Sequence, residues 1–210
     1  MHALSRDAIR GMLVLPEVPA PTQTPAQISN EERERIAVHE AGHAAFALLT
    51  PGYIVDEIDI SADAETEKKG RSTIRRIGSW TYEKYCDQIA AEMAGMAAEV
   101  LLCGNKSGGA NADIKEATDI AVRMICEEGF SPTFGIFAYD LQLTSWQRTE
   151  AILDEARRMV ELGYARALDL LTTHKHLLYR IVYALQTQPR LTNDRLKEIM
   201  NRATRNRPVG

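Results

Sequence analysis

The feature that most constrains this chain is a run of small and apolar residues that also contains three ionisable side chains. The run extends from Ile36 to Leu49 and carries His39, Glu40 and His43. A helix that is apolar on almost all sides is buried, and buried ionisable groups are costly unless they are paired. The run therefore predicts a buried helix whose histidines and glutamate share a partner.

The spacing of these three residues indicates the nature of that partner. A helix places His39 and His43, four positions apart, on one face and one turn from each other. In the pattern His-Glu-x-x-His, the two histidines bind a zinc ion and the glutamate acts on a metal-bound water. We therefore predict His39 and His43 as metal ligands and Glu40 as the catalytic base. Two hydrogen-bonded core histidines are the competing interpretation.

The third ligand decides which class of metal site is present, because a catalytic zinc commonly has three protein ligands and a water. Metzincins use a histidine six positions after the second one, and Leu49 stands there. A thermolysin-like site takes a glutamate from a following helix, for which Glu92 and Glu99 are candidates. Asp113, in the first turn of another predicted helix, is the remaining candidate. Spacing alone leaves these alternatives open.

The rest of the chain predicts a mainly α fold with a small β-sheet, of the α+β class. Ser29 with Glu32 and Thr144 with Gln147 form capping boxes that begin two of the helices. Apolar periodicity predicts the following elements: helices over 30–49, 81–103, about 111–128, 144–172, 174–188 and 192–205, and strands over 54–60 and 72–77. The second strand is partly polar, which suits the edge of a sheet.

Composition bounds the domain organisation and the class of protein. The 210 residues suffice for one domain with an extension. We assign residues 1–30, which are rich in proline, to an N-terminal extension or linker, 31–206 to one domain and 207–210 to a tail. A net charge of −4 gives no basic field for nucleic acid. No apolar run is long enough to span a bilayer, and the three cysteines lack paired spacing, so we expect reduced thiols and a cytoplasmic location.

Three segments, in order, resemble the landmark motifs of the peptidase domain of FtsH-type ATP-dependent zinc metalloproteases (AAA proteases). They are residues 36–44 (IAVHEAGHA), 95–101 (GMAAEVL) and 109–118 (GANADIKEAT). The resemblance covers roughly residues 33–202. The chain departs from the usual family pattern at Met96, Val100 and Ala112. The sequence contains no Gly-x-x-x-x-Gly-Lys-Ser/Thr phosphate loop, so we expect it to correspond to the protease module alone.

The resemblance implies a fold, an activity and a set of site residues. The fold is a zincin-like N-terminal part followed by a helical bundle. The activity is that of a zinc metalloendopeptidase acting on unfolded or loosely folded proteins. One zinc per chain is implied, with His39, His43 and Asp113 as ligands, Glu40 as the base and Glu99 supporting a ligand imidazole.

The resemblance also implies a homo-hexamer, and an AAA ATPase module joined in cis or in trans that delivers polypeptide substrates. Membrane contact is expected only through a part outside this chain, which would place the domain in the cytoplasm or at the cytoplasmic face of a membrane. We further expect the predicted edge strand to bind extended substrate through Ser72, Thr73 and Ile74.

Three alternatives remain at this point. The first is a thermolysin-like peptidase with Glu99 as third ligand, and the second is a zinc-binding oligomerisation module without catalysis. The third is a non-haem iron site, because two histidines and a carboxylate also describe that ligand set.

Overall fold

Helix α2 (Asn30–Leu49) is the element around which the others are arranged in the computed structural model, which describes residues 29–61, 70–140 and 146–205. The Ser29 side chain caps this helix by accepting a hydrogen bond from the backbone N–H of Glu32, at 3.1 Å. From Ala37 to Ala47 every residue but His39 is buried. The prediction of a capped, buried helix is therefore confirmed.

A three-stranded antiparallel sheet packs on α2. Its strands are β1 (Tyr53–Asp59), β2 (Arg71–Arg76) and β3 (Arg190–Thr192), in the order β2-β1-β3. The first two strands were predicted, and β2 occupies the predicted edge position. The sequence analysis missed β3, since three residues are too few to show a periodic pattern. That strand is defined instead by its pairing with residues 57–59 of β1.

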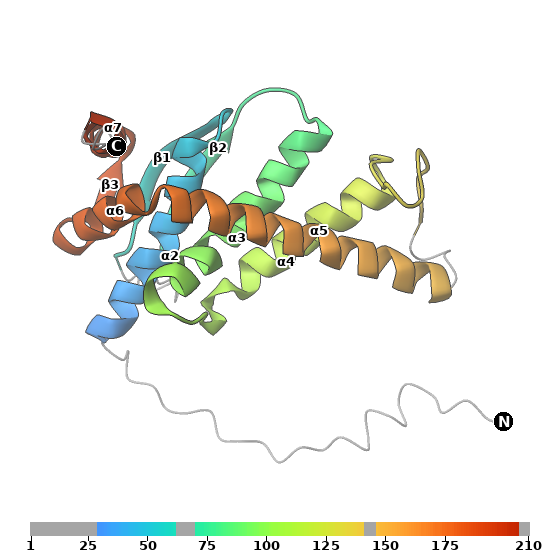
Figure 1. Ribbon diagram of the computed structural model, residues 1–210, viewed down its shortest axis with the longest axis horizontal. Helices are drawn as coiled ribbons and strands as arrows, with labels where there is room; N and C mark the ends of the chain where they lie inside the picture. The colour runs from blue at the N-terminus through green and yellow to red at the C-terminus, as the bar shows by residue number, and fades with distance from the viewer. Residues whose placement is uncertain (1–28, 62–69, 141–145, 206–210) are drawn as a thin grey trace, which may run out of the picture.

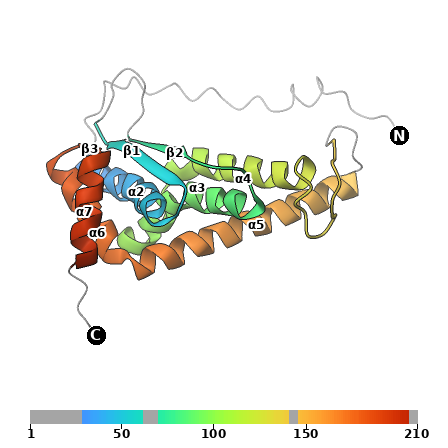
Figure 2. The same cartoon turned by 90° about the horizontal axis from the view of Figure 1, so that it is seen from above.

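The other helices are α3 (Tyr82–Cys103), α4 (Asn111–Cys126), α5 (Trp146–Thr173), α6 (Lys175–Thr187) and α7 (Asn193–Arg205), with a short 3-10 turn η1 (Gly108–Ala110) before α4. In Figure 1, α3, α4 and α5 extend away from the sheet, whereas α6 and α7 lie beside it. Figure 2 shows the sheet and the long helix α5 on opposite sides of α3. The predicted mainly α fold with a small sheet is thus confirmed.

Helix α2 packs against both α3 and α6, and the two contacts differ in character. At Gly42, an added Cβ would lie 2.4 Å from the backbone oxygen of Ala94 and 2.6 Å from Cβ of Ala98, so only glycine permits this approach of α2 to α3. The α6 side contributes large, fully buried aliphatic side chains instead. They are Leu177, Leu178, Ile181 and Leu185.

Some sequence expectations fall outside the described residues. The proline-rich segment 1–28 and the capping residue Thr144 belong to this group. Within the described part, no helix combines the length and the apolar character that crossing a bilayer requires. The three cysteines are free.

Candidate metal centre

Three donor atoms from two helices converge at one point. Helix α2 contributes Nε2 of His39 and of His43, and the first turn of α4 contributes Oδ2 of Asp113. The distances are 2.9 Å from His39 Nε2 to Asp113 Oδ2, 3.2 Å between the two Nε2 atoms, and 3.5 Å from His43 Nε2 to Asp113 Oδ2. The structure thus brings together the three residues that the sequence analysis named as ligands.

The spacing of these donors matches a small divalent metal ion. Tetrahedral ligands at the usual zinc bond lengths of about 2.0–2.2 Å lie roughly 3.3–3.6 Å from one another. The three observed distances are 2.9, 3.2 and 3.5 Å, so small shifts of the side chains would bring all three donor atoms to that spacing. Two imidazoles and a carboxylate are also a donor set that zinc prefers.

The far nitrogen of each ring fixes the direction in which its Nε2 lone pair points. His43 Nδ1 lies 2.8 Å from the backbone oxygen of Ala91, a group that only accepts, so Nδ1 carries the proton. His39 Nδ1 lies 2.8 Å from Oε1 of Glu99, a carboxylate that likewise accepts. In the neutral tautomers, both Nε2 atoms therefore present lone pairs to the same point. This is the arrangement that second-sphere partners impose on metal-binding histidines.

The electrostatics of the centre favour a cation. Burial alone would lower the pKa of His39, but the carboxylates of Asp113 and Glu99 overcome this and raise it to about 10. Burial alone would raise the pKa of Asp113, but its hydrogen bonds with His39 and His43 hold it below the ordinary value. One proton satisfies one His–Asp113 pair, whereas one metal ion satisfies all three donor atoms.

Glu99 lies on the far side of His39 from the donor cluster. It is 1% exposed, and its Oε2 accepts hydrogen bonds from the Ser107 backbone N–H at 2.8 Å and from Arg35 Nη1 at 3.2 Å. Although burial raises the pKa of Glu99, the hydrogen bonds from His39, Ser107 and Arg35 lower it to about 2. A charged carboxylate thus holds the His39 ring in place.

A glycine on α3 makes room for the two imidazoles. A Cβ added at Gly95 would lie 2.5 Å from His43 Nε2 and 2.6 Å from His39 Nε2. Side chains do not approach one another so closely, so any other residue would displace the rings. The sequence analysis placed Gly95 in a motif without seeing that it faces the donors.

Glu40, between the two histidines in sequence, lies beside the donor cluster and contacts the edge strand. Its side chain is buried, and Oε2 accepts a hydrogen bond from the Ser72 hydroxyl at 2.5 Å. The same hydroxyl lies 3.2 Å from the Glu40 backbone oxygen. A residue of β2 thus fixes the carboxylate that the sequence analysis named as the base.

Two cavities open on either side of the donor cluster. One of about 320 Å³ extends toward Tyr53 and Gln88, and the other of about 660 Å³ extends toward Arg35 and Ser107. The residues that line both are His39, Glu40, Gly70, Arg71 and Asp113. The donor cluster therefore lies in the middle of a cleft, beside strand β2, whose outer edge pairs with no strand among the described residues.

The structure also shows site residues that the sequence analysis did not assign. Arg35 precedes His39 by one helical turn, and this spacing could have indicated that Arg35 lies near the metal centre. The Ala91 carbonyl and the Ser107 N–H are backbone groups, which a sequence does not mark. Ser72 and Ile74, two of the three predicted substrate-binding residues, line the cleft, whereas Thr73 is not among the lining residues of the two cavities.

Known proteins resemble this chain over the segment that contains the residues of the metal centre. A sequence model of peptidase family M41 matches residues 26–199. The chain is 29% identical over 189 residues to "ATP-dependent zinc metalloprotease FtsH 2" of Sphaerobacter thermophilus, covering 86% of this chain and 29% of the relative. It is 31% identical over 186 residues to "ATP-dependent zinc metalloprotease YME1 homolog" of Schizosaccharomyces pombe, covering 83% and 26%. The chain thus spans less than a third of the length of these relatives.

Proposed function

This chain belongs to peptidase family M41, and from that membership and the geometry of the site we propose that it is a zinc metalloendopeptidase acting on unfolded or loosely folded polypeptides. The observation that carries the proposal is the convergence of His39, His43 and Asp113 beside the carboxylate of Glu40. Zinc is the metal named for the relatives, and the donor set and spacing of this chain suit it.

We assign the ligands by the atoms that face one another. His39 and His43 would hold the ion through Nε2, and Asp113 through Oδ2. When bound there, zinc supplies a water of lowered pKa and polarises the carbonyl of the scissile bond. Glu99 would keep the His39 ring in its ligating orientation through the Nδ1 hydrogen bond.

Glu40 has the position and the support expected of a general base. Its carboxylate lines both cavities, so an attacking water in the cleft is within its reach. The proton it accepts from that water would then be given to the leaving amine. Ser72 holds Oε2 by its hydrogen bond, which fixes the direction of the carboxylate and leaves Oε1 for the proton transfer.

The edge strand β2 is our candidate for substrate binding. One of its edges pairs with β1, and the other pairs with no strand in the described part of the chain. An extended polypeptide can add to such an edge through main-chain hydrogen bonds, with Ser72, Thr73 and Ile74 alongside it. Binding through the main chain depends little on the side chains of the substrate, which suits a protease that acts on unfolded proteins of varied sequence.

The experiment that tests this function changes Glu40 alone. Glu40→Gln keeps shape and removes the base, so we expect one zinc per chain by metal analysis and a loss of about 100-fold or more in hydrolysis of a denatured protein. Glu34→Gln, at an exposed position on the same helix, is the matched control and should retain full hydrolysis. Wild-type turnover in Glu40→Gln would refute the assignment of Glu40 as the general base.

The same measurement separates the alternative functions. If the wild-type chain binds zinc but hydrolyses nothing, the non-catalytic oligomerisation module is favoured. If it takes up iron and consumes oxygen, the facial-triad alternative is favoured. Asp113→Asn and Glu99→Gln distinguish the ligand sets: a thermolysin-like site would empty in Glu99→Gln and stay full in Asp113→Asn.

The partners follow from the family and remain proposals for this chain. We propose a homo-hexamer that works with an AAA ATPase module in cis or in trans, in the cytoplasm or at the cytoplasmic face of a membrane. Sizing the zinc-loaded chain by light scattering tests the hexamer. Hydrolysis of a folded substrate, with and without an added ATPase module and ATP, tests the need for a motor.

A further inference from the structure

The smaller cavity beside the donor cluster is lined by a carboxylate that the mechanism does not use. Glu92 of α3 lines this cavity of about 320 Å³, together with Tyr53, Gln88 and Ile74. Within the described residues, its hydrogen-bond partner is the Gln88 side-chain amide, one turn earlier on α3. Gln88 in turn accepts a hydrogen bond from the Tyr53 hydroxyl at 3.2 Å. This chain of contacts holds Glu92 in the wall.

Among the described residues, no lysine or arginine forms a salt bridge with Glu92, and the positive charge that acts on it is that of the nearby His43. Arg71 and Arg76 line the same cavity, but Arg71 pairs with Glu57 at 3.3 Å, and the Arg76 guanidinium lies 4.6 Å from the centre of the Trp80 ring. A carboxylate has about four acceptor sites, so the one Gln88 contact leaves most of them open.

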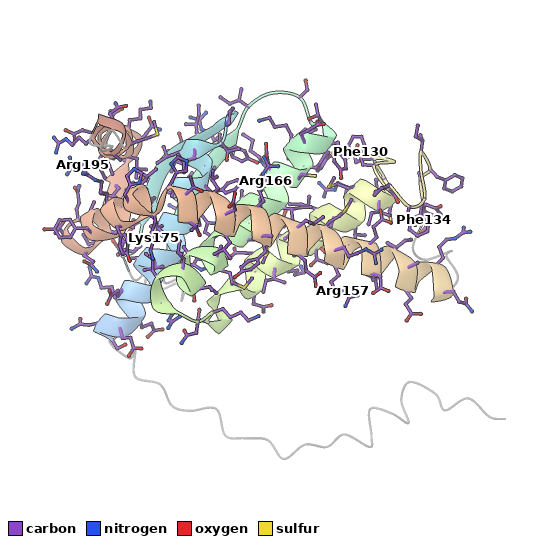
Figure 3. The ribbon with its side chains drawn as sticks, in the orientation of Figure 1. Phe130, Phe134, Arg157, Arg166, Lys175 and Arg195 are labelled. Atoms are coloured by element: carbon purple, nitrogen blue, oxygen red, sulfur yellow. The ribbon has the colours of Figure 1, made fainter. Side chains whose placement is uncertain are left out.

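A second acid on α3 shows the contrast. Asp87, a buried carboxylate on the same helix, pairs with Arg166 of α5, which extends toward α3 in Figure 3. Burial, the largest influence, raises the pKa of Glu92. The positive charge of His43 opposes this, and the nearby carboxylates of Asp113 and Glu116 raise the pKa further. A cation entering this cavity would offset that cost.

We propose that Glu92 makes this cavity a subsite for a basic side chain, so that the enzyme prefers lysine or arginine at a residue flanking the scissile bond. The inference rests on the proposed function, because it places the substrate in the cleft beside the metal. A fixed carboxylate in the wall of a pocket binds an ammonium or guanidinium group by a charge-assisted hydrogen bond. An uncharged side chain of equal length would leave the carboxylate desolvated and unpaired, which is the source of the discrimination.

The test uses two dipeptide hydroxamates that differ in one group. One carries lysine and the other norleucine, which has the same four-carbon side chain without the terminal ammonium. Both are titrated into the zinc-loaded chain by calorimetry, for wild type, Glu92→Gln and the control Glu83→Gln at an exposed position on α3. We expect wild type and Glu83→Gln to bind the lysine compound at least about tenfold more tightly, a difference of about 1.4 kcal/mol. Glu92→Gln should bind the two equally.

Two results would overturn the inference and one would overturn its premise. Equal binding of both compounds by wild type, or an undiminished lysine preference in Glu92→Gln with full zinc content, would refute the role of Glu92 alone. If zinc is absent or neither compound binds wild type, the proposed function falls as well. Cleavage sites in a denatured protein, mapped by mass spectrometry, give a second readout: basic residues should be enriched at one flanking position in wild type and not in Glu92→Gln.

Discussion

The two helices that flank α2 meet it in different ways, and the difference separates function from stability. Toward α3, the contact is made by small residues, and the backbones approach closely enough that Gly42 meets the Ala94 carbonyl. Toward α6, the contact is made by large aliphatic side chains such as Leu178 and Ile181, which are fully buried. Both contacts belong to one hydrophobic cluster.

The close contact is the one that builds the metal centre. His43 can hydrogen-bond to the Ala91 carbonyl of α3 only if the two helices are within reach of a single side chain. Glu99 reaches His39 for the same reason. The α6 contact brings no group to the centre, so its contribution is apolar burial. We therefore expect changes on the α3 side to affect the metal, and changes on the α6 side to affect unfolding.

The largest expected effect is that of Gly95→Ala. The new methyl group would lie within 2.6 Å of ring atoms of both histidines, so the rings must move and the donor set is lost. We expect no stoichiometric zinc by metal analysis and no hydrolysis. Gly108→Ala is the control, because its added methyl meets nothing within 4 Å, and it should keep its zinc. A fully loaded Gly95→Ala chain would show that the close contact is not required.

The converse test is made on the α6 side with Leu178→Ala. Truncating a fully buried leucine lowers the free energy of unfolding by about 2–5 kcal/mol, since transfer and cavity terms add. Urea denaturation with saturating zinc measures this loss, and zinc content below the transition should stay at one per chain. Leu162→Ala, at a site that is 70% exposed, should change stability by less than about 0.5 kcal/mol. Loss of zinc from folded Leu178→Ala would contradict the division of roles.

A smaller effect is expected for Glu99→Gln, which tests the far side of His39. The amide can still accept a hydrogen bond from Nδ1, but the negative charge that supports the ring is removed. Loss of such a partner weakens metal affinity by about 10- to 100-fold. Competition with a zinc chelator measures the change, and Glu34→Gln again serves as the control. An unchanged affinity would show that the Ala91 contact and α2 alone orient the ligands.

The difference between local patterns and contacts between distant segments explains which features the sequence could predict. Helix bounds and the His39–His43 pair follow from local periodicity and spacing. The length of β3 and its pairing with β1 depend on contacts between distant segments, which local patterns do not contain. The Ala91 carbonyl and the Ser107 N–H are backbone groups. Every residue type has a backbone carbonyl, and every type except proline has a backbone N–H, so the residue type at these positions does not mark their roles.

The smallest effect should come from the sheet side of the cleft, where Ser72 contacts Glu40. Ser72→Ala removes one hydrogen bond to the carboxylate but leaves its charge and the three donor atoms intact. A single hydrogen bond to a charged group contributes about 1.5–3 kcal/mol when both partners are buried, and this site opens on the cleft, so we expect a fall in kcat of about tenfold or less. Zinc content should be unchanged, and Ser79→Ala, at an exposed position after β2, should be silent. If Ser72→Ala instead raised KM at constant kcat, the hydroxyl would act on substrate along the strand edge, and Glu40 would be held by α2 alone.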